Sequence, residues 1–225
     1  MKDQSGRDLA SLLSPKPVVS PKPVSNKNDD IYNPRLNWDT TQNPWVPIGE
    51  IDIAVRLLPF KGASPYDEAT PLYIYKPQHK FGGSYTTCND ARNEPCPICD
   101  SKNAKMSEII HGFLVNVLIL KDTQHPELEG RVMLYQCEPD VMERIGSAIE
   151  TCNPFDVEIG NTLTVNILPK LGKPNHINTI KWIESTKIDD VDRVLNACYD
   201  FNEVMDKYVH TLDEISETYR IWGGR

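Results

Sequence analysis

The chain has 225 residues, of which 39% are apolar, so it can bury the core of one large domain or two small ones. Its formal net charge of −8 excludes a protein that works mainly through a broad basic surface, so any contact with nucleic acid must use a local basic patch. No long apolar run indicates a membrane span or the core of a signal peptide, and a cytoplasmic chain without membrane contact is therefore expected.

Residues 1–30 are predicted to form a flexible, proline-rich arm. The motif SPKPV occurs twice, at 14–18 and 20–24. Proline removes backbone donors and favours the extended polyproline II conformation, so the arm is either a plain spacer or a docking peptide. The sequence RDLASLL before the repeats can form a short helical turn that docks on a partner or on a neighbouring copy.

Residues 31–187 are predicted to form the core and are mostly strands. The apolar residues of IDIAVRLLPF (51–60) alternate, as in a half-buried strand, and PLYIYK (71–76) follows the same rule. The run FLVNVLILKD (113–122) has the continuous apolar character of a central strand. It is expected to form a hairpin with GRVMLYQCE (130–138).

Two further elements complete the predicted core. The sequence DVMERIGSAIE (140–150) has helical spacing, and NTLTVNILPK (161–170) is expected to form a hairpin with HINTIKWIES (176–185). Several short strands with one inserted helix are typical of a small β-barrel. The predicted fold class is therefore mainly β, of the α+β kind.

The C-terminal segment, 188–225, is predicted to be helical and acidic. Apolar residues recur at three- and four-residue spacing. Between Asp189 and Thr218 there are nine acidic residues and only two basic ones (Lys and Arg), so the other face of the predicted helix is acidic. Such a face is a candidate surface for partner proteins. The last residues, YRIWGGR, are either a docking peptide anchored by Trp222 or a frayed end.

A cysteine cluster indicates a structural metal. Cys96 and Cys99 can hold one ion from a tight turn that Pro97 helps to fix, and Cys88 adds a third sulfur. The spacing leaves His79 and His111 as alternative fourth ligands. Four ligands would close the coordination sphere of one zinc ion and leave no position for an activated water, so the predicted role is structural.

An enzymatic function is not expected. The sequence EPCPIC contains the Pro-Cys-x-x-Cys half of a zinc deaminase signature, but the His-x-Glu half is absent because Lys80 and Phe81 follow His79. His176 has no second catalytic group near it that would indicate a nuclease. The remaining thiols, Cys137, Cys152 and Cys198, are predicted to be buried apolar residues.

Three ordered motifs resemble the single-stranded DNA-binding (helix-destabilising) proteins of T-even-type phages. These motifs are IAVRLLPF, then HKF with the later cysteine and CPIC, then VNVLILKDTQHPELEGRVMLY, and the resemblance covers roughly 48–182. It implies an OB-fold core with a zinc subdomain inserted at about 76–112. It also selects His79, Cys88, Cys96 and Cys99 as the zinc ligands.

The resemblance implies that the chain coats single-stranded DNA, without sequence preference, in the replication, recombination and repair of phage DNA in an infected bacterial cell. Such binding needs aromatic faces for stacking and cations for phosphates. The resemblance points to Phe113 and Tyr135 as aromatics of the DNA cleft. The further aromatic candidates are Tyr73, Tyr75, Phe81, Tyr85 and Trp182. The basic candidates are Arg56, Lys76, Lys80, Lys102, Lys105, Lys121 and Arg131.

Two departures from that family affect the expected partners. The stretch KMSEIIHG before the central strand carries Glu108 and no arginine, which argues for weaker DNA affinity. The family's basic N-terminal arm is replaced by the proline repeats, so self-association along DNA is expected to be weak or to work differently. The alternative function is a zinc-containing protein-interaction or transcription-accessory module that uses the same core.

Overall fold

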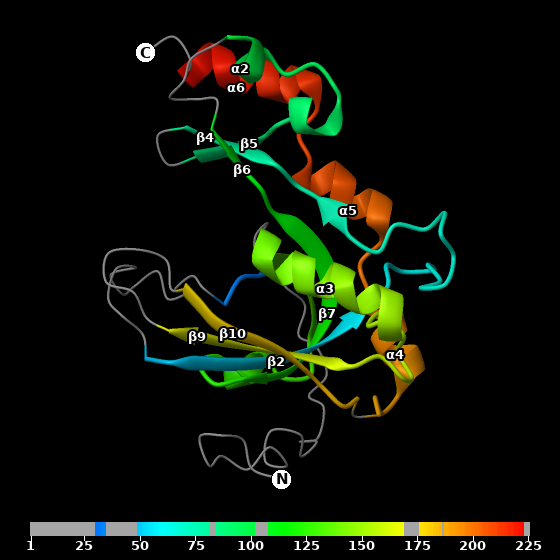
Figure 1. Ribbon diagram of the computed structural model, residues 1–225. Coiled ribbons are helices and arrows are strands. Elements are labelled where there is room, and N and C mark those ends of the chain that lie inside the picture. The colour runs from blue at the N-terminus through cyan, green and yellow to red at the C-terminus, as the bar shows by residue number, and fades with distance from the viewer. Residues whose placement is uncertain are drawn as a thin grey trace.

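In the computed structural model, residues 30–34, 49–81, 84–101, 108–168, 176–185 and 187–222 are described. Of the predicted arm, 1–30, only Asp30 is described, and the candidate cations Lys102 and Lys105 lie outside the described residues. No helix in the described part of the chain is long and apolar enough to cross a membrane. The molecule has a large lobe and a small lobe, joined by the strands that run between them (Figure 1).

The large lobe is a mixed structure built on one seven-stranded sheet. Its strands are β1 (Ile31–Tyr32), β2 (Ile51–Leu58), β3 (Ile74–Tyr75), β7 (Phe113–Asp122), β8 (Val132–Cys137), β9 (Thr162–Leu168) and β10 (His176–Ile183). The strand order is β1-β8-β7-β2-β9-β10, and β3 pairs with β7. Both predicted hairpins, β7–β8 and β9–β10, are present and antiparallel.

The sheet follows an open path among the described residues. Its two ends are β1, which pairs with β8 in parallel, and β10, which pairs with β9. The strand pairings found in these residues therefore do not close the predicted barrel. The two-residue β3 is also much shorter than the predicted strand over 71–76.

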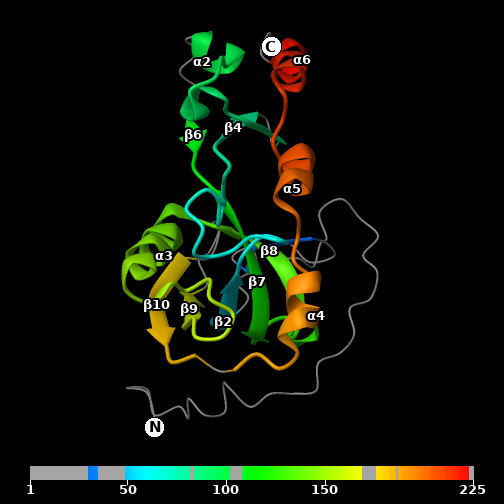
Figure 2. The ribbon, with the colours of Figure 1, turned by 90° about the vertical axis from the view of Figure 1, so that its right-hand side faces the viewer.

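The main core lies on one face of this sheet and is covered by α3 (Pro139–Cys152). The predicted spacing is confirmed, because Val141 and Ile145 of the helix are fully buried against strand residues such as Val115 and Leu163. Pro139 begins the helix at a position where a missing backbone N–H costs nothing. Figure 2 shows α3 beside β9 and β10.

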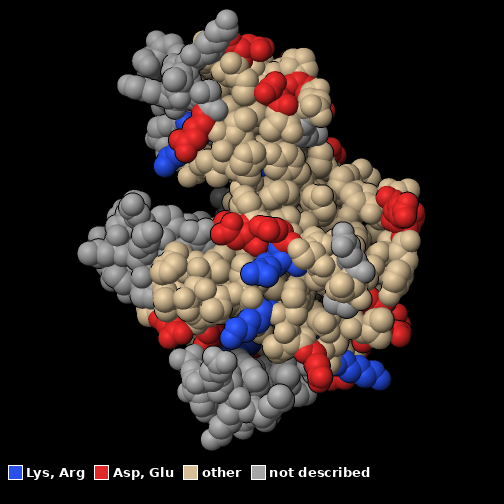
Figure 3. Space-filling view, in the orientation of Figure 1, with Lys and Arg blue, Asp and Glu red and all other residues tan. Residues whose placement is uncertain are grey.

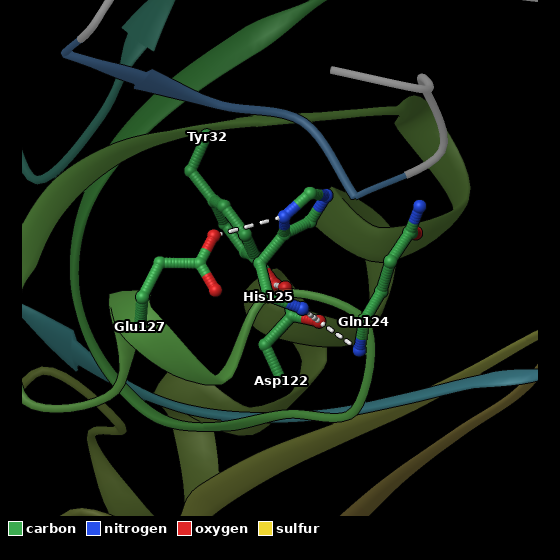
Figure 4. A network of polar contacts seen from close by, with 5 residues as sticks. All are labelled: Tyr32, Asp122, Gln124, His125 and Glu127. Carbon is green, nitrogen blue, oxygen red and sulfur yellow. Dashed lines mark hydrogen bonds and ion pairs between the residues drawn. The ribbon is translucent and has the colours of Figure 1, made fainter. Parts of the chain in front are cut away.

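A buried polar network attaches β1 to the loop between β7 and β8 (Figure 4). The Tyr32 hydroxyl donates a hydrogen bond to Asp122 Oδ2 over 2.7 Å. The other oxygen of Asp122 accepts from the backbone N–H groups of Gln124 and His125, and His125 Nδ1 lies 3.1 Å from Glu127 Oε1. A carboxylate that accepts three hydrogen bonds fixes the loop on the short N-terminal strand.

The small lobe is built on a three-stranded sheet in the order β5-β4-β6. It contains β4 (Gln78–Phe81), β5 (Ser84–Thr87), the 3₁₀ turn η1 (Asp90–Arg92), α2 (Pro97–Asp100) and β6 (Ile109–Ile110). The chain enters this lobe after β3 and returns through β6 directly into β7. The small lobe is therefore an insertion between β3 and β7 of the main sheet.

The C-terminal segment contains three helices. We call α4 (Val191–Asn196), α5 (Phe201–Tyr208) and α6 (Leu212–Trp222) the strap. The strap passes along one side of both lobes (Figures 1 and 2). Asp200 begins α5 by accepting hydrogen bonds from the backbone of Asn202 and Glu203, and Thr211 pairs with Glu214 at the start of α6.

Each helix of the strap packs on a different part of the molecule. Val194 of α4 packs with Leu58 and Leu118 of the large lobe. Val204 of α5 belongs to a second apolar cluster with Phe60 and Leu114. The third helix, α6, reaches the small lobe, and its predicted apolar face is only partly buried because Leu212 is exposed.

Candidate metal centre and aromatic strip

The small lobe brings four potential metal ligands together. His79, Cys88, Cys96 and Cys99 each offer one ligand atom, and these atoms lie within 4.8 Å of one another. Three of the residues are buried, and Cys99 is half-buried. The sequence left two histidines open, and the structure places His79 in this cluster.

The local fold explains why these four residues converge. His79 lies on β4, and Cys88 directly follows β5, where its N–H donates to the Pro77 carbonyl over 2.8 Å. Cys96 and Cys99 flank the first turn of α2, which begins at Pro97. A hairpin thus supplies two ligands, and a single helical turn supplies the other two.

The distances fit a tetrahedral zinc ion. The Sγ atoms of Cys88 and Cys99 are 3.7 Å apart, and His79 Nε2 lies 3.5 Å from Cys96 Sγ and 3.4 Å from Cys99 Sγ. A tetrahedron with ordinary Zn–S and Zn–N bonds has S–S edges of about 3.8 Å and S–N edges of about 3.5 Å. The four residues can therefore hold one metal ion, and the donor set of three thiolates and one imidazole suits zinc.

The thiols differ in their electrostatic surroundings. Burial raises the pKa of Cys96, but hydrogen bonds from backbone amides, including those of Cys99 and Asn89, outweigh it and hold that pKa below its ordinary value. Burial raises the pKa of Cys88 and Cys99. A bound metal ion would deprotonate all three, because a coordinating thiol is held as the thiolate. Cys137 and Cys198 are confirmed as buried thiols outside the cluster.

The strap completes the apolar surroundings of the metal cluster. Ile215 of α6 is fully buried with Cys88, Cys96 and Ile98. His210, just before α6, accepts a hydrogen bond through Nδ1 from the Thr87 N–H over 3.1 Å. The Thr87 hydroxyl in turn accepts from the His210 N–H over 3.0 Å.

A second feature lies where the small lobe joins the large one. Tyr73, Phe113, Tyr75 and His111 form a continuous series of rings that we call the aromatic strip. The ring centroids of Tyr73 and Phe113 are 5.8 Å apart, and those of Phe113 and Tyr75 are 5.2 Å apart. The Tyr75 hydroxyl lies 2.6 Å from His111 Nδ1, and the two rings are nearly parallel, with centroids 5.9 Å apart and an interplanar angle of 7°.

The strip is open to solvent at both ends. Tyr73 is 40% exposed, His111 is exposed, and the two central rings are half-buried. The strands β3 and β7 position it, because Tyr75 and Phe113 are register partners. A series of rings with accessible edges and faces can stack with nucleobases in a sequence-tolerant way.

The remaining candidates are spread over both lobes. Lys80 and Tyr85 are exposed register partners on β4 and β5, while Phe81 has no described side chain. Lys121, near the opposite end of β7 from the strip, is half-exposed, as is Arg131. Trp182 is half-buried and packs against the main core. On the face in Figure 3, the described basic and acidic side chains are interspersed.

Three of the predicted DNA contacts are buried in the structure. Arg56 is fully buried and donates to the Ser185 hydroxyl over 2.6 Å and to the Asp156 carbonyl over 2.8 Å. Tyr135 is 1% exposed, with its ring 5.7 Å from that of Tyr32. Lys76 is 8% exposed, and its Nζ lies 5.3 Å above the Tyr208 ring. In this conformation their surroundings give them structural roles.

The sequence did not reveal the places of two further aromatic residues, His111 and Tyr66. His111 was considered only as a metal ligand, although its place immediately before the central strand put it near Phe113. Tyr66, which is 65% exposed, lies in a turn whose position only the folded chain shows. Its hydroxyl donates a hydrogen bond to the Asp156 carboxylate.

Comparison with known proteins shows similarity to a phage protein. The chain is 27% identical over 165 residues to a protein named single-stranded DNA-binding protein from Enterobacteria phage T4. The match covers 66% of this chain and 52% of that protein, so the chain spans about half the length of the curated relative it matches. No protein-family model matches the sequence.

Proposed function

We propose that the chain binds single-stranded DNA without sequence preference and performs no chemistry on it. The aromatic strip carries this proposal, because it offers four adjoining rings at the junction of the lobes. The similarity to a phage single-stranded DNA-binding protein supports the same function. The process would be the replication, recombination or repair of phage DNA in the cytoplasm of an infected bacterium.

In this proposal the bases of the open strand stack on the strip, and exposed cations neutralise phosphates nearby. Among the described residues of the small lobe, Lys80 is a suitable cation, because it is exposed on β4 and follows Tyr75 of the strip by five residues. A duplex would be destabilised by mass action, since only the open strand binds. The large lobe would be an OB-type core, and the acidic outer face of the strap would serve partner proteins.

The metal in this proposal is one structural zinc ion. The ion would fix the small lobe, because it would join the β4–β5 hairpin to the turn of α2 through four side chains. That lobe forms one side of the junction at which the strip lies. The ion would therefore act on DNA binding indirectly, by keeping His111 and the ends of β3 and β7 in place.

The proposal is tested by titrating the protein with oligo(dT) and with a duplex of equal length while recording its intrinsic fluorescence. The four Trp and nine Tyr residues of the chain provide the signal. We expect saturable quenching by the single strand and weaker binding of the duplex. Absence of binding to oligo(dT) at low salt would contradict the proposal and favour a protein-interaction module.

A further inference from the structure

The large lobe contains a cavity of about 640 Å³ beside the aromatic strip, within the size range of ligand sites. Three tyrosines, Tyr66, Tyr73 and Tyr75, line it together with Pro65 and Pro71. We call this cavity the tyrosine pocket. Tyr66 lies in a turn and is 65% exposed, so part of its ring is accessible to a ligand from solvent.

The charges at the edge of the pocket favour a ligand that carries positive charge. Asp67 and Glu68 are exposed and also line the pocket. Asp67 is held in place, because its carboxylate accepts hydrogen bonds from the Ala69 N–H and the Thr70 hydroxyl, each over 3.0 Å. A pocket with aromatic walls and an acidic edge suits an extended, apolar peptide that carries positive charge.

The chain itself contains such a peptide. The segment SPKPVVSPKPV (14–24) has four prolines, two lysines and no acidic residue. Polyproline II has three residues per turn, and the two repeats are offset by six positions, so corresponding residues of both repeats lie on the same edge. Lys16 and Lys22 would thus share one edge, and the prolines would occupy the other two. Aromatic-lined grooves recognise this preformed, low-entropy conformation.

The length of the chain before the described core allows one repeat to reach the pocket. Val18 ends the first repeat 12 residues before Asp30, and an extended chain of that length spans up to about 40 Å. Asp30 lies beside α5. Its carboxylate is 3.4 Å from the Tyr208 hydroxyl, and the Tyr208 ring lies under Lys76, the neighbour of Tyr75.

We propose that the tyrosine pocket binds an SPKPV repeat of the same chain. The proline rings pack between Tyr66 and Tyr73, and the lysine of the repeat faces Asp67 and Glu68. One repeat, about 15 Å long, occupies the pocket at a time. Because Tyr73 and Tyr75 belong to both the pocket and the aromatic strip, a docked repeat and a stacked base compete for the same rings.

Zero-length carbodiimide cross-linking of the full chain, followed by mass spectrometry, tests this docking without DNA. We expect Lys16 or Lys22 to be joined to Asp67 or Glu68 within one chain, which mixing of ¹⁴N- and ¹⁵N-labelled copies identifies. Lys2 and Lys27 of the same arm are internal controls. Equal cross-linking of all four lysines to these carboxylates, or none from the repeats, would overturn the proposal, as would cross-links only between copies.

Two variants make the test specific. Replacing Pro15, Pro17, Pro21 and Pro23 by Ala leaves the described core unchanged, and it should lower the yield of the repeat cross-link at least fivefold. Tyr66→Ser should have the same effect. The matched control is Tyr85→Ser, which removes a tyrosine that is 48% exposed and outside the pocket, and it should leave the yield unchanged. Unchanged yields in the proline and Tyr66 variants would overturn the docking.

A last experiment, with DNA present, distinguishes this inference from the proposed function. Excess oligo(dT) should lower the yield of the repeat cross-link, because bases and the repeat share two tyrosines. If the cross-link forms as expected but oligo(dT) does not change it, the docking is supported and base stacking on Tyr73 and Tyr75 is contradicted. If oligo(dT) binds but the specific cross-link never forms, the docking is overturned and the proposed function stands.

Discussion

Tyr75 and Phe113 are register partners on β3 and β7, and their ring centroids lie 5.2 Å apart. Tyr75 lies just before the chain enters the small lobe, and Phe113 lies just after the chain leaves it. The pair therefore stands between the metal cluster and the main sheet. Tyr73 and His111 extend it on both sides. The fold thus arranges residues from two separate segments into one surface that suits stacking with bases.

Truncation of the strip should weaken binding of single-stranded DNA. We expect Tyr73→Ala and Phe113→Ala each to raise the Kd for oligo(dT) by about 5- to 150-fold, because stacking of one base on one ring contributes about 1–3 kcal/mol. Fluorescence anisotropy of a labelled oligonucleotide measures the change. Leu212→Ala is the control, because Leu212 is 44% exposed, similar to Tyr73 at 40%, but lies on α6.

Binding should weaken with salt, and one exposed lysine should account for part of that dependence. Neutralisation of one phosphate of a single strand contributes about −0.7 to the slope of log K against log salt. Lys80→Ala should reduce the slope by about this amount. The control is Lys187→Ala, in the segment between β10 and α4, which Figure 1 shows at the end of the large lobe away from the small one. Equal slopes for both variants would contradict this role of Lys80.

Removal of the metal should unfold the small lobe. A structural zinc contributes folding free energy of about 10–16 kcal/mol in small zinc domains. We expect Cys96→Ser to lose stoichiometric zinc and to lower the Tm, as a chelator should in the unmodified protein. Cys198→Ala removes a buried thiol outside the cluster and should retain one zinc per chain. A Cys96→Ser variant with full zinc content and unchanged melting would contradict the metal centre.

The strap should stabilise the small lobe through one buried side chain. The side chain of Ile215 is fully buried and packs with Cys88, Cys96 and Ile98. Ile215→Ala should cost about 2–5 kcal/mol of unfolding free energy. It should also speed release of zinc to a chelator. Leu212→Ala on the same helix should change stability by less than about 0.5 kcal/mol, because Leu212 is largely exposed.

The buried Lys76 should make stability depend on pH. Burial lowers the pKa of Lys76 to about 8, whereas a lysine in an unfolded chain has a pKa of about 10.4. The unfolded chain therefore binds more protons between these values, and stability should rise with pH across this window. Below about pH 8 the full cost of burying the charge remains.

Lys76→Met should remove this dependence. The variant lacks the buried charge and should therefore be more stable than the unmodified protein at pH 7. The expected gain is about 1–2 kcal/mol, because the loss of the cation–π attraction to Tyr208 offsets part of it. The difference should vanish near pH 10.5. Denaturant unfolding at several pH values measures it, with the exposed Lys61→Met as a control. A difference that does not vary with pH would contradict the assignment.

The sequence predicted the local elements well where one physical signal dominated. Alternation and continuous apolar runs located β2, β7, β8 and β9, and helical spacing located α3, because each of these elements buries one face against the core. The Cys-Pro-Ile-Cys turn, with Cys88 close by in sequence, indicated the metal cluster, since a tight turn brings two thiols close enough to share one ion. The resemblance then favoured His79, which the structure places with the three cysteines.

Other features depend on contacts that no local pattern reveals. Arg56 and Tyr135 had the residue types expected of a DNA cleft, but both are buried, and tertiary partners such as Asp156 and Tyr32 decide their roles. The helical spacing of the C-terminal segment did not show that it would divide into three helices. Nor did it show that Ile215 would reach the metal cluster, because that contact depends on the path of the whole strap.

Photo-cross-linking can show directly whether bases stack on the aromatic strip. Oligo(dT) that carries a single 5-iodouracil would be irradiated with the unmodified protein, and the joined residues identified by mass spectrometry. The account predicts cross-links at Tyr73, Tyr75, His111 or Phe113. Specific cross-links confined to other residues, or none under conditions of saturated binding, would contradict it.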